Sequence, residues 1–152
     1  MLDIEFYKKL MFDVIGDVRE AHCELGAGLN ESCYQEGMQL QPDELGIPYL
    51  REQSFHPFYH KKAMQTMFRI DFLCKNEIIV ECESVSELLP VRRAQLFNYM
   101  RLLKKPCGLI VNFAPKNNII ERYFYDNETN NMLGLDGKII YDFKSRKVRQ
   151  YL

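Results

Sequence analysis

The sequence predicts an α/β fold in which two helices are followed by three strands, a helix and a strand, with a β-rich carboxyl-terminal segment. Apolar residues near the amino terminus recur every three or four positions, which is typical of an amphipathic helix. Short apolar runs at 68–73, 78–82 and 107–113 indicate strands, and a helical pattern separates the last two. These two periodicities are the basis of the predicted fold class.

Two helices are expected before the first strand. Gly26, Ala27 and Gly28 end the first helix, and Asn30 is the expected cap of the second. Glu31 then lies in the first turn of the second helix, where the helix dipole favours an anion, and Pro42 interrupts this helix. The first helix is predicted over residues 3–25 from the helical spacing of Ile4, Tyr7, Met11, Val14, Val18 and Leu25.

Three strands are expected next. Residues 53–60 alternate in polarity, and Pro57 indicates an edge position because proline cannot donate to a sheet. The next two strands, 68–73 and 78–82, are joined by Lys75-Asn76-Glu77, a plausible three-residue hairpin loop because Asn tolerates positive φ.

The second half of the chain begins with a helix from Pro90, a favoured first-turn residue, to about Lys104. Residues 107–113 then read as a buried strand and 119–125 as another. Asp136-Gly137 is typical of a hairpin turn leading into 139–141.

Composition limits the possible partners. With 152 residues, 47% of them hydrophobic, the chain can bury a real core, so we expect residues 1–152 to form one domain. A formal charge of −1 gives no overall attraction to nucleic acid, so such binding requires a local basic patch. The sequence shows neither a membrane-span pattern nor a signal-peptide pattern, and its five scattered cysteines favour reduced, buried thiols and a cytoplasmic location.

The two apolar strands at 68–73 and 78–82 carry carboxylates, which are costly to bury without a partner. A three-residue loop sets Asp71 opposite Glu81 on one face, with Glu83 on the same face opposite Arg69. A two-residue loop would instead set Asp71 opposite Val80 and turn Glu81 to the other face. In the first register, the carboxylates are suitable ligands for a hard divalent cation.

Several motifs together resemble the GxxExxY protein family. Its signature matches the segment 25–34 through Gly28, Glu31 and Tyr34, and the match covers about residues 10–115, leaving 116–152 as an extension. That family is similar to the PD-(D/E)XK nucleases, whose restriction-endonuclease-like core is a mixed central sheet flanked by helices in the order ααβββαβ. The further matching pieces are Gln53, Arg69-Ile70-Asp71, Ile79-Val80-Glu81, the segment 95–100 and the segment 108–113.

The resemblance implies metal-dependent hydrolysis of phosphodiester bonds in nucleic acid, with Mg²⁺ or Mn²⁺ as the cofactor. It implies that Asp71 and Glu81 bind the metal, that Glu31 is a further metal ligand, and that Gln95 positions water or substrate. The metal would lower the pKa of a bound water and neutralise charge on the phosphate.

The sequence departs from the family pattern at Glu83, which stands where the E-x-K element has its lysine. Glu reverses the charge next to the scissile phosphate, so we expect weak or lost activity. Glu83 could instead form a cross-strand ion pair with Arg69. The missing cation could come from a neighbouring element, through Arg92, Arg93 or Lys62.

Two of these residues also have a purely structural interpretation. Glu31 could simply complement the helix dipole, and Tyr34 is more typical of a core residue than of a catalytic one. Three functions therefore remain open: a Mg²⁺-dependent nuclease with a modified site, a non-catalytic nucleic-acid-binding relative, and a protein-interaction domain that retains only the fold.

Overall fold

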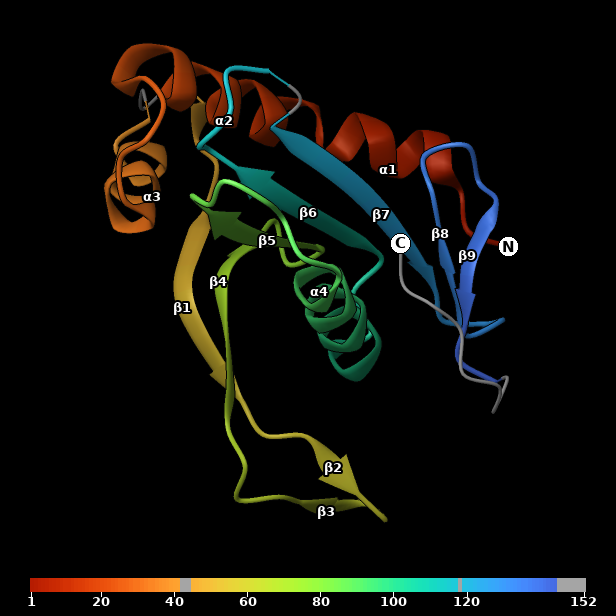
Figure 1. The fold of residues 1–152 in the computed structure, drawn as a ribbon. Coiled ribbons are helices and arrows are strands. Elements are labelled where there is room, and N and C mark those ends of the chain that lie inside the picture. The colour runs from red at the N-terminus through yellow and green to blue at the C-terminus, as the bar shows by residue number, and fades with distance from the viewer. Residues whose placement is uncertain (42–44, 118, 145–152) are drawn as a thin grey trace.

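A seven-stranded sheet forms the centre of the molecule, and helices cover both of its faces (Figure 1). The computed structural model describes residues 1–41, 45–117 and 119–144. The strand order is β1-β4-β5-β6-β7-β8-β9, in which only β5 and β6 are parallel and every other neighbouring pair is antiparallel. The sheet strands are β1 (Tyr49–Phe55), β4 (Phe68–Cys74), β5 (Ile78–Glu83), β6 (Cys107–Asn112), β7 (Ile120–Asp126), β8 (Asn131–Leu133) and β9 (Ile139–Asp142).

Two apolar layers fill the space between the sheet and the helices. One lies under α1 (Ile4–Leu10), α2 (Phe12–Leu25) and α3 (Glu31–Gln39). The other lies under α4 (Pro90–Leu103), where Leu96 and Met100 pack so closely on β6 that a Cβ added at Gly108 would lie 2.4 Å from the Met100 sulfur. The mixed sheet flanked by helices that the sequence predicts is confirmed.

The single helix expected over residues 3–25 is wrong in one detail, because α1 and α2 are separate helices that run end to end (Figure 1). Met11 lies between them, and its N–H still bonds to the Tyr7 carbonyl at 3.1 Å. The Met11 carbonyl likewise accepts from Ile15 at 3.0 Å. Helical hydrogen bonding therefore crosses the junction, which explains why the apolar spacing continues through it.

The first strand also differs from the expectation of 53–60. It spans Tyr49–Phe55 and ends before Pro57, while Phe58–Tyr59 (β2) pairs with Lys62–Ala63 (β3) in a separate hairpin. The edge position inferred from Pro57 is confirmed, because β1 is the outermost strand of the sheet.

The β-rich tail is confirmed for the described residues. β8 and β9 pair antiparallel across a turn in which Gly137 has a φ of 80°. Of the five cysteines, Cys74, Cys82 and Cys107 are buried and Cys33 is partly buried, whereas Cys23 is exposed, against the expectation of buried thiols.

Candidate active site

The β4–β5 hairpin sets Asp71 level with Glu81. The two strands are joined by the three-residue loop that the sequence predicts, in which Lys75 and Asn76 both have positive φ, of 53° and 58°. The paired positions are Phe72 with Val80, Leu73 with Ile79 and Cys74 with Ile78. One step further along this register lies Asp71 opposite Glu81, so the two-residue-loop alternative is excluded.

The regular β4–β5 pairs stop just short of Asp71, and the Asp71 side chain makes the contact with β5 instead. Its Oδ2 accepts a hydrogen bond from the backbone N–H of Cys82 at 2.8 Å. On the other side of β4, the ladder with β1 lacks a pair at Glu52, which has a φ of 55°. The Asp71 carboxylate is thus held by the β5 backbone at the level where β4 loses its regular pairing with β5 and with β1.

Glu81 lies beside Asp71 with a carboxyl group that is poorly solvated. Burial raises its pKa well above the usual range, and the neighbouring Asp71 charge, a hydrogen bond to Asp71 and the Glu83 charge raise it further. Its Oε1 is buried and has no hydrogen-bond partner among the residues that the structure describes. A buried carboxyl oxygen without a partner is costly, so this atom favours either a proton or a cation nearby.

Glu83 and Glu31 form a second carboxyl pair. Glu31 begins α3, whose first turn is capped by the Asn30 side chain accepting from the Cys33 N–H at 3.0 Å. Glu83 is only 7% exposed, and burial raises its pKa. The Glu31 and Asp71 charges and a hydrogen bond to Glu31 add to this rise, while Arg92 opposes it.

We refer to Glu31, Asp71, Glu81 and Glu83 as the acidic cluster. Ile79 belongs to the apolar layer under α4 and Cys82 to the opposite layer, so strand alternation turns Glu81 and Glu83 toward the α4 side. The structure thereby brings together four of the five predicted site residues.

The cation beside the acidic cluster comes from α4. Arg92 Nε lies 3.7 Å from Glu83 Oε1, so the ion pair expected between Arg69 and Glu83 is replaced by one from the first turn of α4. Among the described residues, no ion pair joins Arg69 to Glu83. The reason is that the β4–β5 pairs end at Phe72 and Val80, short of the position where Arg69 would face Glu83.

The other two candidate cations are placed elsewhere. Arg93 forms two hydrogen bonds to the Glu121 carboxylate, at 2.6 and 2.7 Å. Lys62 is exposed on the β2–β3 hairpin, which extends away from the sheet (Figure 1). Arg92 is therefore the candidate cation that the structure sets against the acidic cluster.

Gln95 does not join the cluster. Its Nε2 donates to the Tyr99 hydroxyl at 2.7 Å, one turn further along α4, and in the described part of the chain it forms no hydrogen bond to the four carboxyl groups. The polar partner of Gln95 thus lies on its own helix.

Sequence reasoning missed two residues that shape the site. The buried Asn112 at the end of β6 accepts from the Val85 N–H at 3.1 Å and donates to the Val85 carbonyl at 2.9 Å, which fixes the chain after Glu83. Ser84 Oγ donates to the Leu29 carbonyl at 2.6 Å and ties β5 to the loop before Glu31. The sequence signal that could have identified Asn112 is its position as a polar residue at the end of an otherwise apolar strand.

Tyr34 is a core residue, as expected. It is fully buried and stacks on Phe113, with ring centroids 4.1 Å apart. Its hydroxyl donates to the Gly26 carbonyl and accepts from the Leu29 N–H at 3.1 Å. The loop leading into Glu31 is thereby closed on the Tyr34 hydroxyl.

The donor set fits a hard divalent cation. All four groups supply carboxyl oxygens, and Glu81 Oε1 is a buried oxygen without a partner. In the part of the chain that the structure describes, no three such side chains form a group that could itself hold a metal ion. Mg²⁺ is commonly held by one or two carboxylates plus water and substrate phosphate, so Asp71 and Glu81 would suffice as protein ligands.

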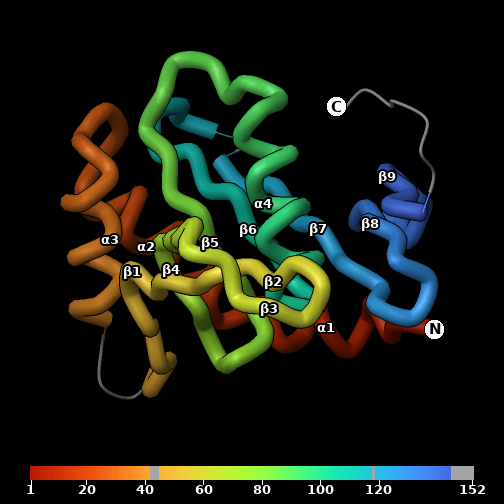
Figure 2. The backbone as a smooth tube through the Cα atoms, turned by 90° about the horizontal axis from the view of Figure 1, so that it is seen from below, coloured from red at the N-terminus to blue at the C-terminus, as the bar shows by residue number. Residues whose placement is uncertain are grey.

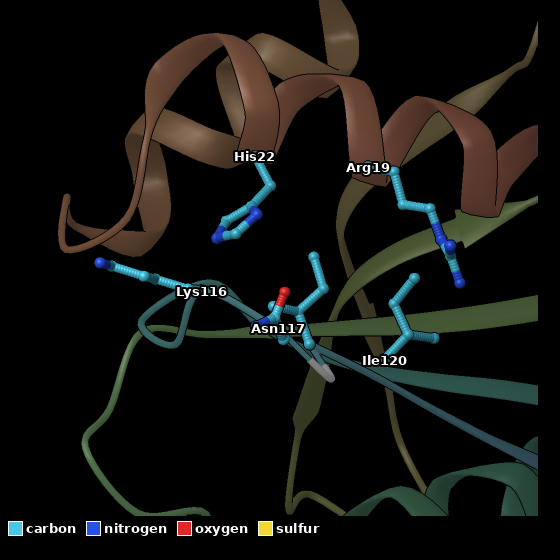
Figure 3. A pocket seen from close by; sticks show the side chains of 6 residues that line it. Arg19, His22, Lys116, Asn117 and Ile120 are labelled. Atoms are coloured by element: carbon cyan, nitrogen blue, oxygen red, sulfur yellow. The ribbon is translucent and has the colours of Figure 1, made fainter.

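A basic pocket lies near the same end of the sheet, between α2 and the turn after β6 (Figure 3). It has a volume of about 380 Å³ and is lined by Arg19, His22, Lys116, Asn117, Ile119 and Ile120. Arg19 and Lys116 form no ion pair within the described residues. The turn that carries Lys116 starts at Phe113, whose N–H donates to the Glu83 carbonyl at 2.9 Å, so the pocket is structurally linked to the acidic cluster.

Residues 8–123 match the family model of the PD-(D/E)XK nuclease superfamily. The chain belongs to this superfamily. The PD-(D/E)XK match includes the acidic cluster and Gln95 and reaches into β7, whereas β8 and β9 lie outside it. The chain is thus a nuclease-like protein of a superfamily that typically uses divalent metals.

No curated protein and no solved structure matches the chain. Within the described residues, none of the helices has both the length and the apolar character needed to cross a bilayer.

Proposed function

We propose that this chain hydrolyses phosphodiester bonds in nucleic acid with a divalent cation held at Asp71 and Glu81. The observation that carries the proposal is the convergence of four carboxyl groups from two strands and a helix start, with raised pKa values at Glu81 and Glu83. Such a gathering costs stability unless protons or a cation offset the charges, and enzymes retain such costs at functional sites.

The carboxyl groups have distinct roles in this proposal. Asp71 is held by the Cys82 N–H and provides a fixed oxygen ligand. Glu81 provides its free Oε1 and gives up its proton when a cation replaces it, since ligands must be deprotonated to bind metal. A bound divalent cation would lower the pKa of a coordinated water and offset the phosphate charge. Glu31 at the start of α3 is hydrogen-bonded to Glu83 and adds its charge to the cluster.

Arg92 takes over the electrostatic role of the missing motif lysine. Its side chain is about half exposed, and its guanidinium at 3.7 Å from Glu83 is close enough to reach a phosphate bound at the cluster. A guanidinium stays protonated in proteins, so Arg92 would stabilise negative charge on the phosphate and would not transfer protons. Glu83 in turn orients Arg92.

Nucleic acid is the proposed substrate because Arg19 and Lys116, which form no ion pair within the described residues, lie near the same end of the sheet as the acidic cluster. The pocket at Arg19, His22 and Lys116 offers a seat for a backbone phosphate next to the turn hydrogen-bonded to Glu83. A second function, nucleic-acid binding without cleavage, is favoured by one observation: Glu83 occupies the position of the catalytic lysine and already neutralises Arg92 in part.

Calorimetric titration of Mn²⁺ tests the metal site. We expect the native chain to bind Mn²⁺ and Asp71→Ala to lose that binding. Glu36→Gln, which changes an exposed carboxyl one to two turns beyond Glu31 on α3, is the matched control and should bind as the native chain does. Absence of Mn²⁺ binding to the native chain would refute the metal-dependent function.

Cleavage assays then separate the two functions. We expect Glu83→Lys to cleave labelled DNA or RNA with Mn²⁺ faster than the native chain, because it restores the family's positive charge next to the phosphate. Arg92→Gln should lower the activity of the native chain and have less effect in the Glu83→Lys background. Metal binding without cleavage by either the native chain or Glu83→Lys would leave binding alone as the function.

A further inference from the structure

An exposed aromatic hairpin projects from the sheet at some distance from the acidic cluster. Phe58 and Tyr59 in β2 are 69% and 68% exposed, although both are large rings. The hairpin turn at His60 and Lys61 has positive φ at both residues, 48° and 63°, the two-residue geometry that fits the twist of paired strands. The two rings are therefore displayed on a well-formed element.

Seen from below, the β2–β3 hairpin lies in front of the end of α4 (Figure 2). Residues of the hairpin and of the last turn of α4 line one groove. The groove has a volume of about 950 Å³, and its apolar surface comes from Phe55, Pro57, Phe58, Ala63, Leu102 and Leu103. Lys61, Arg101 and Lys104 supply positive charge, and none of its lining residues is acidic. Within the described part of the chain, the buried Nε of Arg101 has no hydrogen-bond partner.

We propose that the β2–β3 hairpin binds single-stranded nucleic acid in this groove, with a base stacked on Phe58 and backbone phosphates paired with Lys61 and Lys104. Aromatic side chains beside a positively charged groove are the elements that single-strand-binding proteins combine. A single strand is favoured over a duplex because its bases have open faces on which the rings can stack.

The charges argue against a second copy of the chain as the occupant. A two-fold contact through this hairpin would bring Lys61 and Lys62 of both copies together, and like charges in an interface are unfavourable. A polyanion is favoured by the same charges.

Helix α4 connects the groove to the acidic cluster, so this inference rests on the proposed function. Arg92 in its first turn faces Glu83, and Leu102 and Leu103 at its end line the groove. A helix of 14 residues is about 21 Å long at 1.5 Å per residue. A strand lying along α4 would therefore be held at the hairpin on the order of 20 Å from the bond that is cut.

Fluorescence anisotropy with labelled single-stranded DNA and RNA, in EDTA so that nothing is cleaved, tests the inference. Phe58→Ala should weaken binding roughly 5- to 150-fold, the range for losing one stacked base. Phe12→Ala removes a ring that is 79% exposed on α2 and should leave affinity within about twofold. Lys61→Gln should reduce the slope of affinity against salt by about one phosphate contact.

Three results would overturn the inference: no binding of single strands by the native chain, equal affinities for the hairpin variants and Phe12→Ala, or a dimer in sedimentation that the hairpin variants dissociate. Thermal melts check that each variant is folded. Because the assay contains EDTA, its outcome does not depend on metal binding at Asp71 and Glu81. Failure of the hairpin therefore leaves the Mn²⁺ titration to judge the nuclease function separately.

Discussion

Replacing Tyr34 by Phe tests whether the loop before Glu31 is held by one hydroxyl group. The change keeps the ring and its stack on Phe113, whose planes are within 3° of parallel. It removes the group that donates to the Gly26 carbonyl and accepts from the Leu29 N–H. The substitution therefore separates packing from hydrogen bonding.

The expected cost follows from the groups left behind. Each net hydrogen bond is worth about 0.5–1.5 kcal/mol, so losing two costs about 1–3 kcal/mol of unfolding free energy. For a chain of this size, 1 kcal/mol lowers Tm by roughly 2–4 °C, so we expect a fall of about 2–12 °C. Glu31 follows Leu29 closely in the chain, so Mn²⁺ affinity should fall as well.

Urea denaturation and thermal melting, followed by Mn²⁺ calorimetry, measure these effects. Tyr59→Phe is the matched control, because its ring is 68% exposed and its loss of a hydroxyl should change stability by less than about 0.5 kcal/mol. If Tyr34→Phe is as stable as Tyr59→Phe, the hydroxyl does not hold the loop. If it is less stable but binds Mn²⁺ unchanged, the loop does not control Glu31.

Two further predictions concern charge and packing. Because burial and the Asp71 charge raise the pKa of Glu81, the native state holds a proton that the unfolded chain loses above about pH 4.3. The stability that this proton contributes is complete below that pH and declines as pH rises toward the native pKa. In EDTA, the urea midpoint of Glu81→Gln should therefore fall less with rising pH than that of the native chain. The same pH dependence of the urea midpoint in both chains would refute this. Gly108→Ala would place a methyl 2.4 Å from the Met100 sulfur, within the packing of α4 on β6. We expect it to cost about 1–3 kcal/mol in the same denaturation assay, and an unchanged urea midpoint would show that Met100 moves aside freely.

The sequence alone determined the features that depend on neighbouring residues. The three-residue loop at 75–77 and the two-residue period of strands together predicted that Asp71 faces Glu81, and the register confirms it. Asn30 and Glu31 were placed correctly at the start of α3, because a helix cap is a local hydrogen-bonding pattern. The motif resemblance added the superfamily, which the family match confirms.

Only the tertiary structure decided which side chains meet across elements. Arg92, Arg93 and Lys62 were equivalent as replacement cations in the sequence, but the contact with Glu83 depends on how α4 is rotated and how closely it approaches β5. That placement is set by Leu96 and Met100 packing on Gly108, contacts made between residues distant from the acidic strands in sequence. Local periodicity fixes which face a side chain occupies, whereas its partner on another element is fixed by packing.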